Sequence, residues 1–269
     1  SVAGMFTTNK VLSPSVVLTK DRSSRGIAQV VVANSGCANC AVGSQGLDDA
    51  VEMASLAATE VDVDPESVLV ASTGMIGVEL PVALIRQHIG EIRLQEDAGR
   101  EFARAIITTD THEKEMAITT DLDGHRVTIG GCAKGVGMIH PNMATMLAFI
   151  TTDASVEGLF LNQVTKESVD TSFNMIDVDG DMSTNDTVLV FANGLAGGPQ
   201  VKSGTNAAKA FQEALTYVCT DLAKQLVRDG EGAQRLVEVT VEGAASLEDA
   251  RLAARGVSSS MLVKAMVHG

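Results

Sequence analysis

The chain has 269 residues, a formal net charge of −14 and only 3% aromatic side chains. This composition does not favour nucleic-acid binding, because phosphate binding needs basic patches and single strands need aromatic platforms. No run of about 18 apolar residues occurs, so no membrane helix is expected. The first residues lack the basic and apolar segments of a signal peptide. Four cysteines are too few for a disulfide scaffold, which favours a reducing cytoplasm.

The N-terminal half is expected to alternate strands with helices. Runs of β-branched residues predict strands, whereas apolar residues at alternating steps of four and three predict one face of a helix. On these grounds strands are expected at residues 16–19, 27–33 and 68–71, and helices at residues 47–61, 81–89 and 99–107. Pro81 is well placed to begin the second of these helices.

The C-terminal half begins with Asp123-Gly124, a dipeptide typical of a two-residue hairpin loop. A Gly-rich connection is expected next, before a dense apolar segment that predicts a central strand. The expected elements are strands at 116–120, 126–129, 143–152, 187–192 and 236–241, and helices at 157–173, 207–227 and 247–255, the last capped by Ser246. The fold class is therefore α/β, or α+β with long helices covering the faces of sheets.

Residues 134–149 run from the Gly-rich stretch through Pro141 and Asn142 into the apolar strand, with Thr145 behind the small Ala144. On pattern alone, this is a loop that enters a core strand. The functional interpretation is cleavage before Thr145, which frees an α-amine beside the hydroxyl of the same residue. That amine, with a pKa near 8, supplies the base that a weak hydroxyl nucleophile needs. A nearby cation such as Lys134 lowers its pKa further.

Two further segments offer polar groups that suit acyl transfer. Thr73 and Gly74 follow a short strand, where a hydroxyl and backbone N–H groups can bind an oxyanion, although a capped turn explains the pattern equally simply. Thr111 closes a polar cluster after a helix, and Glu231 lies between two glycines. Either a solvated loop or a substrate contact fits these residues.

Patterns for metals and phosphates are incomplete. Cys37 and Cys40 have CxxC spacing but no partner pair, which favours small residues in a turn. A calcium loop that starts at Asp177 requires Gly sixth and Glu twelfth, where Met182 and Val188 stand. Gly135 after Lys134 breaks the phosphate-loop pattern. No metal or nucleotide cofactor is expected.

Taken together, these segments resemble the ornithine acetyltransferase family of arginine biosynthesis, also called glutamate N-acetyltransferase. The resemblance runs over nearly the whole chain, at residues 3–9, 34–36, 71–77, 108–111, 133–153, 183–187, 192–194 and 262–264. The stretch at 134–153 is the most specific. This combination outweighs the simpler local interpretation of each segment.

The resemblance implies a two-sheet sandwich between helical layers and a precursor that cuts itself between Ala144 and Thr145. The products are an α chain (1–144) and a β chain (145–269) that remain associated, commonly as α2β2. The resemblance also implies that Thr145 is the nucleophile and that Thr73 and Gly74 form the oxyanion hole. It implies substrate contacts at Thr111, Lys134 and Glu231.

The implied reaction is ping-pong acetyl transfer from N-acetylornithine to Thr145 and then to glutamate. From the charges we infer that Lys134 faces a substrate carboxylate and Glu231 an ammonium. The sequence does not tell whether acetyl-CoA also serves as a donor.

Family chains extend upstream of Ala3 and continue past Gly269 into a tail with further substrate contacts. The chain is therefore either a piece of a longer protein or has an incomplete pocket. Two other functions remain open: a self-processed threonine-nucleophile aminopeptidase or amidase that passes the acyl group to water, and a non-catalytic truncated assembly protein.

Overall fold

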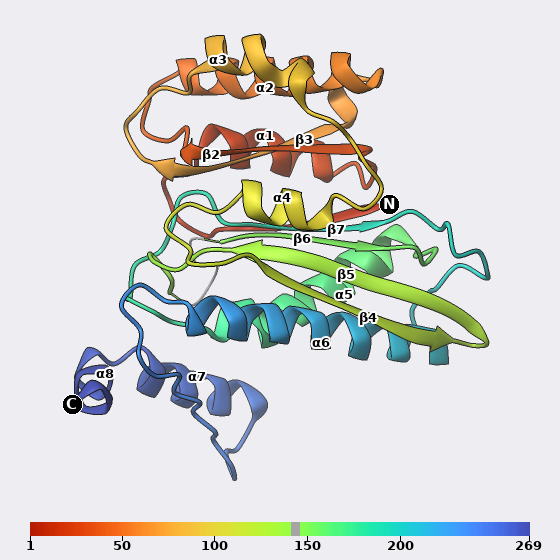
Figure 1. Cartoon of the computed structure of the whole chain (residues 1–269). Helices are drawn as coiled ribbons and strands as arrows, with labels where there is room; N and C mark the ends of the chain where they lie inside the picture. Colours follow the sequence, from red (N-terminus) through yellow and green to blue (C-terminus); the bar gives the residue numbers. More distant parts are fainter. Residues whose placement is uncertain (141–145) are drawn as a thin grey trace.

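The computed structural model describes residues 1–140 and 146–269. Ala144 and Thr145, and with them the expected cleavage site, lie outside the described residues. Two β-sheets stack face to face, and helices cover the outer side of each (Figure 1). The expected two-sheet sandwich between helical layers is confirmed.

The larger sheet has the strand order β1-β7-β6-β5-β4. Its strands are β1 (Val2–Phe6), β4 (Lys114–Leu122), β5 (His125–Lys134), β6 (Leu147–Thr152) and β7 (Thr187–Ala192). The central strand β6 runs parallel to β7 and antiparallel to β5. In that register Leu147 lies opposite Lys134, so the beginning of β6 is beside the end of β5.

The smaller sheet pairs β2 (Val30–Cys37) with β3 (Val68–Met75) in parallel. Helix α2 (Gln45–Val61) makes the crossover between them, and α3 (Val82–His88) packs with α2. Helix α1 (Pro14–Ser23) covers the second edge of β3: the Thr19 hydroxyl accepts the Val70 N–H at 2.8 Å and donates to the Val70 carbonyl at 2.6 Å. The edge is thereby closed to other strands.

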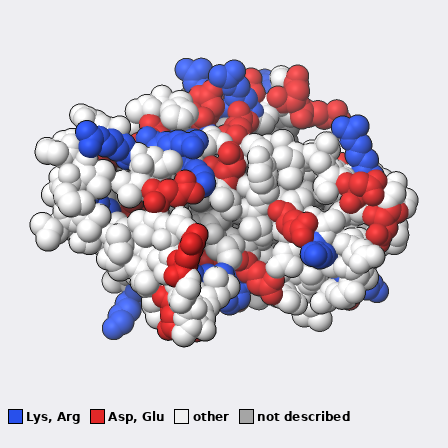
Figure 2. Space-filling model, turned by 90° about the horizontal axis from the view of Figure 1, so that it is seen from below, with Lys and Arg blue, Asp and Glu red and all other residues white. Residues whose placement is uncertain are grey.

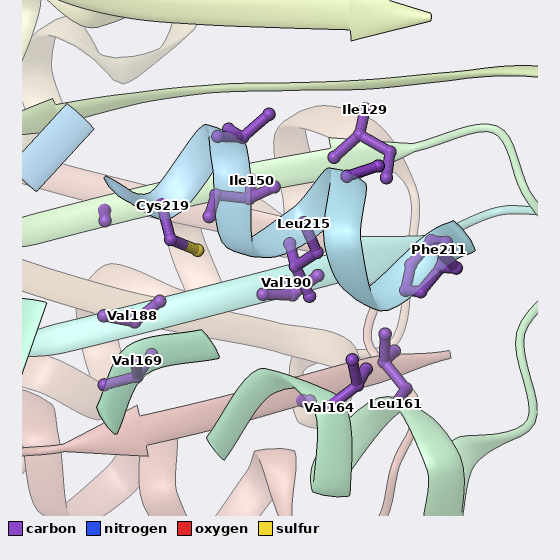
Figure 3. Packing of buried hydrophobic residues seen from close by; sticks show 14 of the residues in the cluster. Ile129, Ile150, Leu161, Val164, Val169, Val188, Val190, Phe211, Leu215 and Cys219 are labelled. Carbon is purple, nitrogen blue, oxygen red and sulfur yellow. The ribbon is translucent and has the colours of Figure 1, made fainter. Parts of the chain in front are cut away.

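Apolar side chains fill three layers, of which one lies between α2 and the smaller sheet. Between the sheets, Leu69 of β3 meets Leu147 and Leu189 of the larger sheet, and α4 (Gly99–Ala105) adds Phe102 against Phe149. On the outer face of the larger sheet, α5 (Gly158–Thr171) and α6 (Asn206–Arg228) pack on β5, β6 and β7 (Figure 3). Because this packing is continuous, both sheets form a rigid frame for the residues at their ends.

The remaining elements are short or terminal: η1 (Pro65–Ser67), η2 (Ile89–Glu91), η3 (Phe173–Met175), α7 (Leu247–Ser258) and α8 (Met261–His268). Helices α7 and α8 lie at the lower left of Figure 1, outside the layered body. Seen from below, acidic and basic side chains are scattered over the face without one large patch of a single sign (Figure 2). In the described ranges, no helix is both long and apolar enough to cross a bilayer.

Most expected elements are confirmed with small shifts in their bounds. Strand 187–192 has the expected bounds, and the Asp123-Gly124 loop joins β4 to β5 with positive φ at both residues. The expected strand at 143–152 is confirmed from Leu147 onward. Ser246 caps α7, since its hydroxyl accepts the Asp249 N–H.

Four expectations were wrong. Thr73 and Gly74, expected to follow a strand at 68–71, belong to β3, because they pair with Ser35 and Gly36 of β2. Residues 16–19 belong to α1 instead of a strand, because Ser13 caps the helix and Pro14 begins it, and the helix then docks on β3. Residues 236–241 form no strand, and Leu236 and Val237 are exposed without a neighbouring strand to pair with. The Gly-rich connection at 130–137 is strand β5 as far as Lys134.

Candidate functional site

Polar residues from separate parts of the chain meet where β3 and β5 end and β6 begins. Strand β3 contributes Thr73, and β5 contributes Lys134, which lies opposite Leu147 of β6. The loops at 108–112 and 229–233 lie next to them, tied by hydrogen bonds to β5 and to each other. The layered frame therefore brings together most of the expected site residues.

Thr73 and Gly74 lie at the end of β3, opposite Ser35 and Gly36 of β2. Gly74 has φ +130°, and a Cβ there would lie 2.2 Å from the Gly36 carbonyl carbon. Only glycine fits this backbone, because a side chain would be strained and would also clash. Both the positive φ and the close packing therefore exclude a side chain at the position next to Thr73.

Lys134 is almost fully buried, with 2% of its surface exposed. Its ammonium donates to the Thr73 hydroxyl at 3.0 Å and to the Thr108 hydroxyl at 2.9 Å. Burial lowers the pKa of Lys134, while the charge of Asp110 opposes that shift. The group is a buried cation bound mainly to two hydroxyls, with the Asp110 carboxylate 3.8 Å away.

Behind Lys134 lies a buried ionic cluster, which we define as Asp110, Lys114 and Asp229. The Lys114 ammonium contacts Asp110 at 2.8 Å and Asp229 at 2.7 Å. Burial by itself would raise the pKa of Asp110, but the Gly135 N–H, Lys114 and Lys134 outweigh it and hold the pKa below its ordinary range. The pKa of Asp229 is likewise lowered, because bonds from Lys114 and Thr111 outweigh the effect of burial. Both carboxyl groups are therefore favoured in their ionised form.

In front of the cluster is a surface cavity of about 680 Å³, a volume typical of small-molecule pockets. Thr109, Thr111 and Glu231 line it, with neighbours of the 229–233 loop. Glu231 accepts a hydrogen bond from the Thr109 hydroxyl at 2.8 Å. A Cβ at Gly137 would lie 2.8 Å from the Glu231 carboxyl carbon, so this glycine leaves the room that the carboxylate occupies.

Asp186 is a fully buried carboxyl group just before β7. Its Oδ1 accepts the Met146 N–H at 3.0 Å, and Met146 precedes the first residue of β6. Oδ2 has no hydrogen-bond partner among the described residues, although the Ser183 and Thr7 hydroxyls lie near the carboxyl group. Burial raises the pKa of Asp186 to about 8. The carboxyl group can therefore change its protonation near neutral pH.

The acidic turn at 177–181 contacts the chain on the other side of the undescribed segment. Asp179 accepts the N–H groups of Met138 and Ile139, and the Asp177 carboxylate binds His140 at 2.6 Å. Asp177 also binds Lys264 of α8. Within the turn the Asp181 N–H bonds to the Asp179 carboxylate, and the turn additionally holds residues 138–140.

The structure brings together Thr73, Gly74 and Lys134, and places Thr111 and Glu231 at the nearby cavity. Cys37 and Cys40 are buried free thiols near the end of β2. Sequence reasoning did not single out four polar residues: Asp110, Lys114, Asp186 and Asp229. The step of four from Asp110 to Lys114 was a weak signal, and nothing local pointed to Asp229 as their partner.

Comparison with known proteins finds relatives that match the whole chain. The model of the ArgJ family matches residues 1–269. The chain is 51% identical over 267 residues to the arginine biosynthesis bifunctional protein ArgJ of Dehalococcoides mccartyi, covering 99% of this chain and 66% of that protein. It is 53% identical over 271 residues to the protein of the same name from Symbiobacterium thermophilum, covering 100% of this chain and 67% of that protein.

Among solved structures, the crystal structure of ArgJ from Bacillus halodurans is 39% identical, with a TM-score of 0.50. The match covers 54% of this chain and 75% of that one. The chain spans about two thirds of the length of the curated relatives. With a family match over all its residues and relatives at this identity, the chain belongs to the ArgJ family.

Proposed function

We propose that the chain is the acetyl-transferring part of an arginine-biosynthesis enzyme that cuts itself before Thr145. The observation that carries the proposal is the meeting of Thr73, Lys134 and the start of β6, next to a cavity lined by Thr111 and Glu231. Membership of the ArgJ family, whose curated members are named for arginine biosynthesis, supports the same reaction class.

The first proposed step is self-cleavage. The Thr145 hydroxyl attacks the Ala144 carbonyl, the peptide C–N bond breaks, and water then opens the resulting ester. The products are an α chain (1–144) and a β chain (145–269) that stay associated as α2β2. Because Thr145 then carries a free amine next to its hydroxyl, one residue supplies both base and nucleophile.

Acetyl transfer follows in two halves. Thr145 attacks the acetyl carbonyl of N-acetylornithine, and ornithine leaves with the proton that the Thr145 amine has taken. The glutamate amine then attacks the acetyl ester and N-acetylglutamate is released. Each half passes through a tetrahedral oxyanion, and the hydroxyl of Thr73 with the N–H of Gly74 is proposed to bind it.

The bonds around Lys134 support this role for Thr73. Since the Thr73 oxygen accepts from Lys134, its own O–H hydrogen can be donated to a substrate oxygen, and a nearby cation favours negative charge there. Glu231 is exposed at the cavity and is suited to bind the ammonium of either amino acid. Lys134 is proposed to attract the substrate carboxylate through its charge.

The proposal includes a cytoplasmic location and no metal or nucleotide cofactor. Its relatives are named bifunctional, and we extend the proposal to acetyl-CoA as a second acetyl donor. Glutamate acetylation measured with acetyl-CoA as the sole donor tests this extension, and no product above the uncatalysed rate rejects it.

The decisive experiment uses the purified full-length protein. Mass spectrometry should find a chain that begins Thr-Met-Leu-Ala, and the protein should transfer acetyl from N-acetylornithine to glutamate. Thr145→Ala should remain uncut and inactive. The matched control is Thr151→Ala, an exposed threonine of β6, which should be cut and active. An intact 144–145 bond in the wild-type protein rejects the proposal.

Two other results would redirect the proposal. Release of free acetate without acetylated glutamate identifies the chain as an amidase or aminopeptidase-type hydrolase that uses water as acceptor. A stable, uncut and inactive protein identifies a non-catalytic assembly protein.

A further inference from the structure

Lys114 is a lysine whose side chain has no exposed surface. All three hydrogens of its ammonium have acceptors: Asp110 at 2.8 Å, Asp229 at 2.7 Å and the His112 carbonyl at 3.2 Å. An ammonium has three donors and no acceptor, so its capacity is used completely. Lys114 itself cannot contact a molecule in the cavity, because it is covered by its own partners.

Each of the two carboxylates also holds backbone that leads to the cavity or to Lys134. Asp110 accepts the Gly135 N–H at 2.8 Å, directly after Lys134. Asp229 accepts the Thr111 N–H at 2.9 Å and also binds the Thr111 hydroxyl. One cation therefore joins the 108–112 loop, the end of β5 and the end of α6.

Glu231, which also lines the cavity, is held in place through the same carboxylates. Glu231 is two residues beyond Asp229, and its backbone N–H donates to the Val136 carbonyl at 2.8 Å. Its carboxylate accepts from Thr109, one residue before Asp110. Displacement of Asp229 or of Asp110 would therefore move Thr111 and Glu231 together.

A buried ion pair is weak support for a purely stabilising role, because apolar residues of similar volume often serve stability as well or better. A buried network that joins three separate segments is better suited to hold one geometry. All the segments joined here border the cavity or Lys134.

We propose that Lys114 is a positioning residue for amino-acid binding: through Asp229 and Asp110 it holds Thr111 and Glu231 in the arrangement that binds the substrate. This inference rests on the proposed acetyl transfer for the identity of the ligand. Lys114 touches neither substrate nor reacting atoms, so its loss should weaken binding more than it slows the chemical step.

The test compares Lys114→Met with wild type in the full-length protein. The KM for glutamate should rise by about tenfold while kcat stays within about threefold, the pattern of lost binding rather than lost transition-state stabilisation. The control is Lys166→Met, an exposed lysine on α5, which should change neither constant. A folded Lys114→Met protein with unchanged KM overturns the proposal, as does a loss of kcat alone.

A second variant covers the case in which Lys114→Met does not fold. Asp229→Asn keeps an oxygen for the Thr111 N–H but removes the charge that binds Lys114. It should raise KM in the same direction, by a smaller factor. Equal KM for this variant and wild type contradicts the positioning role.

Hydrogen exchange without substrate separates this inference from the proposed function. In Lys114→Met the amides of Thr111 and Gly135 should exchange about tenfold faster than global unfolding of the variant allows, while amides of β2 and β3 should exchange at the limit set by its global unfolding. A wild-type protein without acetyl transfer rejects the proposed function, yet this exchange pattern would still support positioning by Lys114. Unchanged exchange at both amides, or uniformly faster exchange over the whole chain, overturns it.

Discussion

Two buried polar regions flank the start of β6 and behave in opposite ways. In the Asp110, Lys114 and Asp229 cluster, carboxylates bind a buried ammonium within 2.8 Å, and their pKa values fall below the ordinary range. Asp186 is equally buried, but among the described residues its carboxyl group accepts one backbone N–H and forms no ion pair, and its pKa rises to about 8. Burial alone therefore does not set the charge of a carboxyl group here; the nearest cation does.

This difference suits two kinds of task. Carboxylates with lowered pKa values keep their hydrogen bonds to more acidic pH and can hold loops in place. A carboxyl group that titrates near neutral pH can change its hydrogen bonds, and Asp186 is such a group, bonded to the N–H of Met146. Substitutions that remove a charge from either region test whether the neighbouring cation sets the pKa of each carboxyl group.

The largest effect is expected for Lys114→Met. Removal of the ammonium leaves Asp110 and Asp229 as buried like charges, and breaking a buried ion pair costs about 3–5 kcal/mol of unfolding free energy. Urea unfolding at neutral pH measures the loss. A change below about 1 kcal/mol would mean that the two carboxylates find other partners, and the contrast with Asp186 would be lost.

The next effect is expected for Asp110→Asn. The Asn side chain would place an N–H donor where the carboxylate oxygen now accepts the Thr108 N–H and faces the Lys134 ammonium. Loss of bonds to a charged group costs about 1.5–3 kcal/mol. The folded pKa of Asp110 lies below 3.8, so its contribution is present above pH 3.8 and is lost as pH falls through the folded pKa. Urea unfolding at acidic pH should show a flatter acid limb in the variant. An unchanged acid limb contradicts the assignment.

The opposite sign is expected for Asp186→Asn. Between pH 3.8 and about 8 the folded Asp186 holds a proton that the unfolded chain has released. Unfolding free energy should therefore fall as pH rises through that window, with a slope of up to about 1.4 kcal/mol per pH unit from this group. The asparagine variant should lack this slope, as measured by urea unfolding across the window. Asp110→Asn is the control and should keep it.

The smallest effect is expected for the exposed pair between Lys166 and Asp170. Water screens such a pair, so Lys166→Met should change unfolding free energy by no more than about 0.5 kcal/mol. Thermal unfolding beside Lys114→Met makes the comparison direct. Similar losses for both lysines would show that burial of the counter-charge does not matter in this fold.

Local sequence predicted much of the fold where the signal for an element lies within the element itself. Helix α2 follows from apolar periodicity, the β4–β5 hairpin from Asp123-Gly124, and the start of α7 from Ser246. Each signal lies within a few residues of the structure that it forms. The predicted strand at 236–241 was wrong for the complementary reason, because a strand needs a partner and none of the described strands pairs with these residues.

Local signals alone were not enough for residues 16–19. The β-branched residues there resemble a strand, but the cap at Ser13 and the docking of Thr19 on β3 make them helical. The same limit applies to the site. Thr73, Lys134, Thr111 and Glu231 were expected from the family resemblance, whereas no local pattern indicated that Asp110, Lys114 and Asp229 would form one cluster.

The amino-acid sequence by itself determined the α/β class, most of the helices and strands, and the family with its candidate site residues. Only the tertiary structure decided which charges face each other: Lys114 meets Asp229 across 115 positions in the chain, and Asp186 is fully buried, so that desolvation outweighs the charge of Lys134. Sequence neighbours specify backbone hydrogen bonds over a few residues, but a pKa depends on solvent and charge in three dimensions, which only the packed layers define.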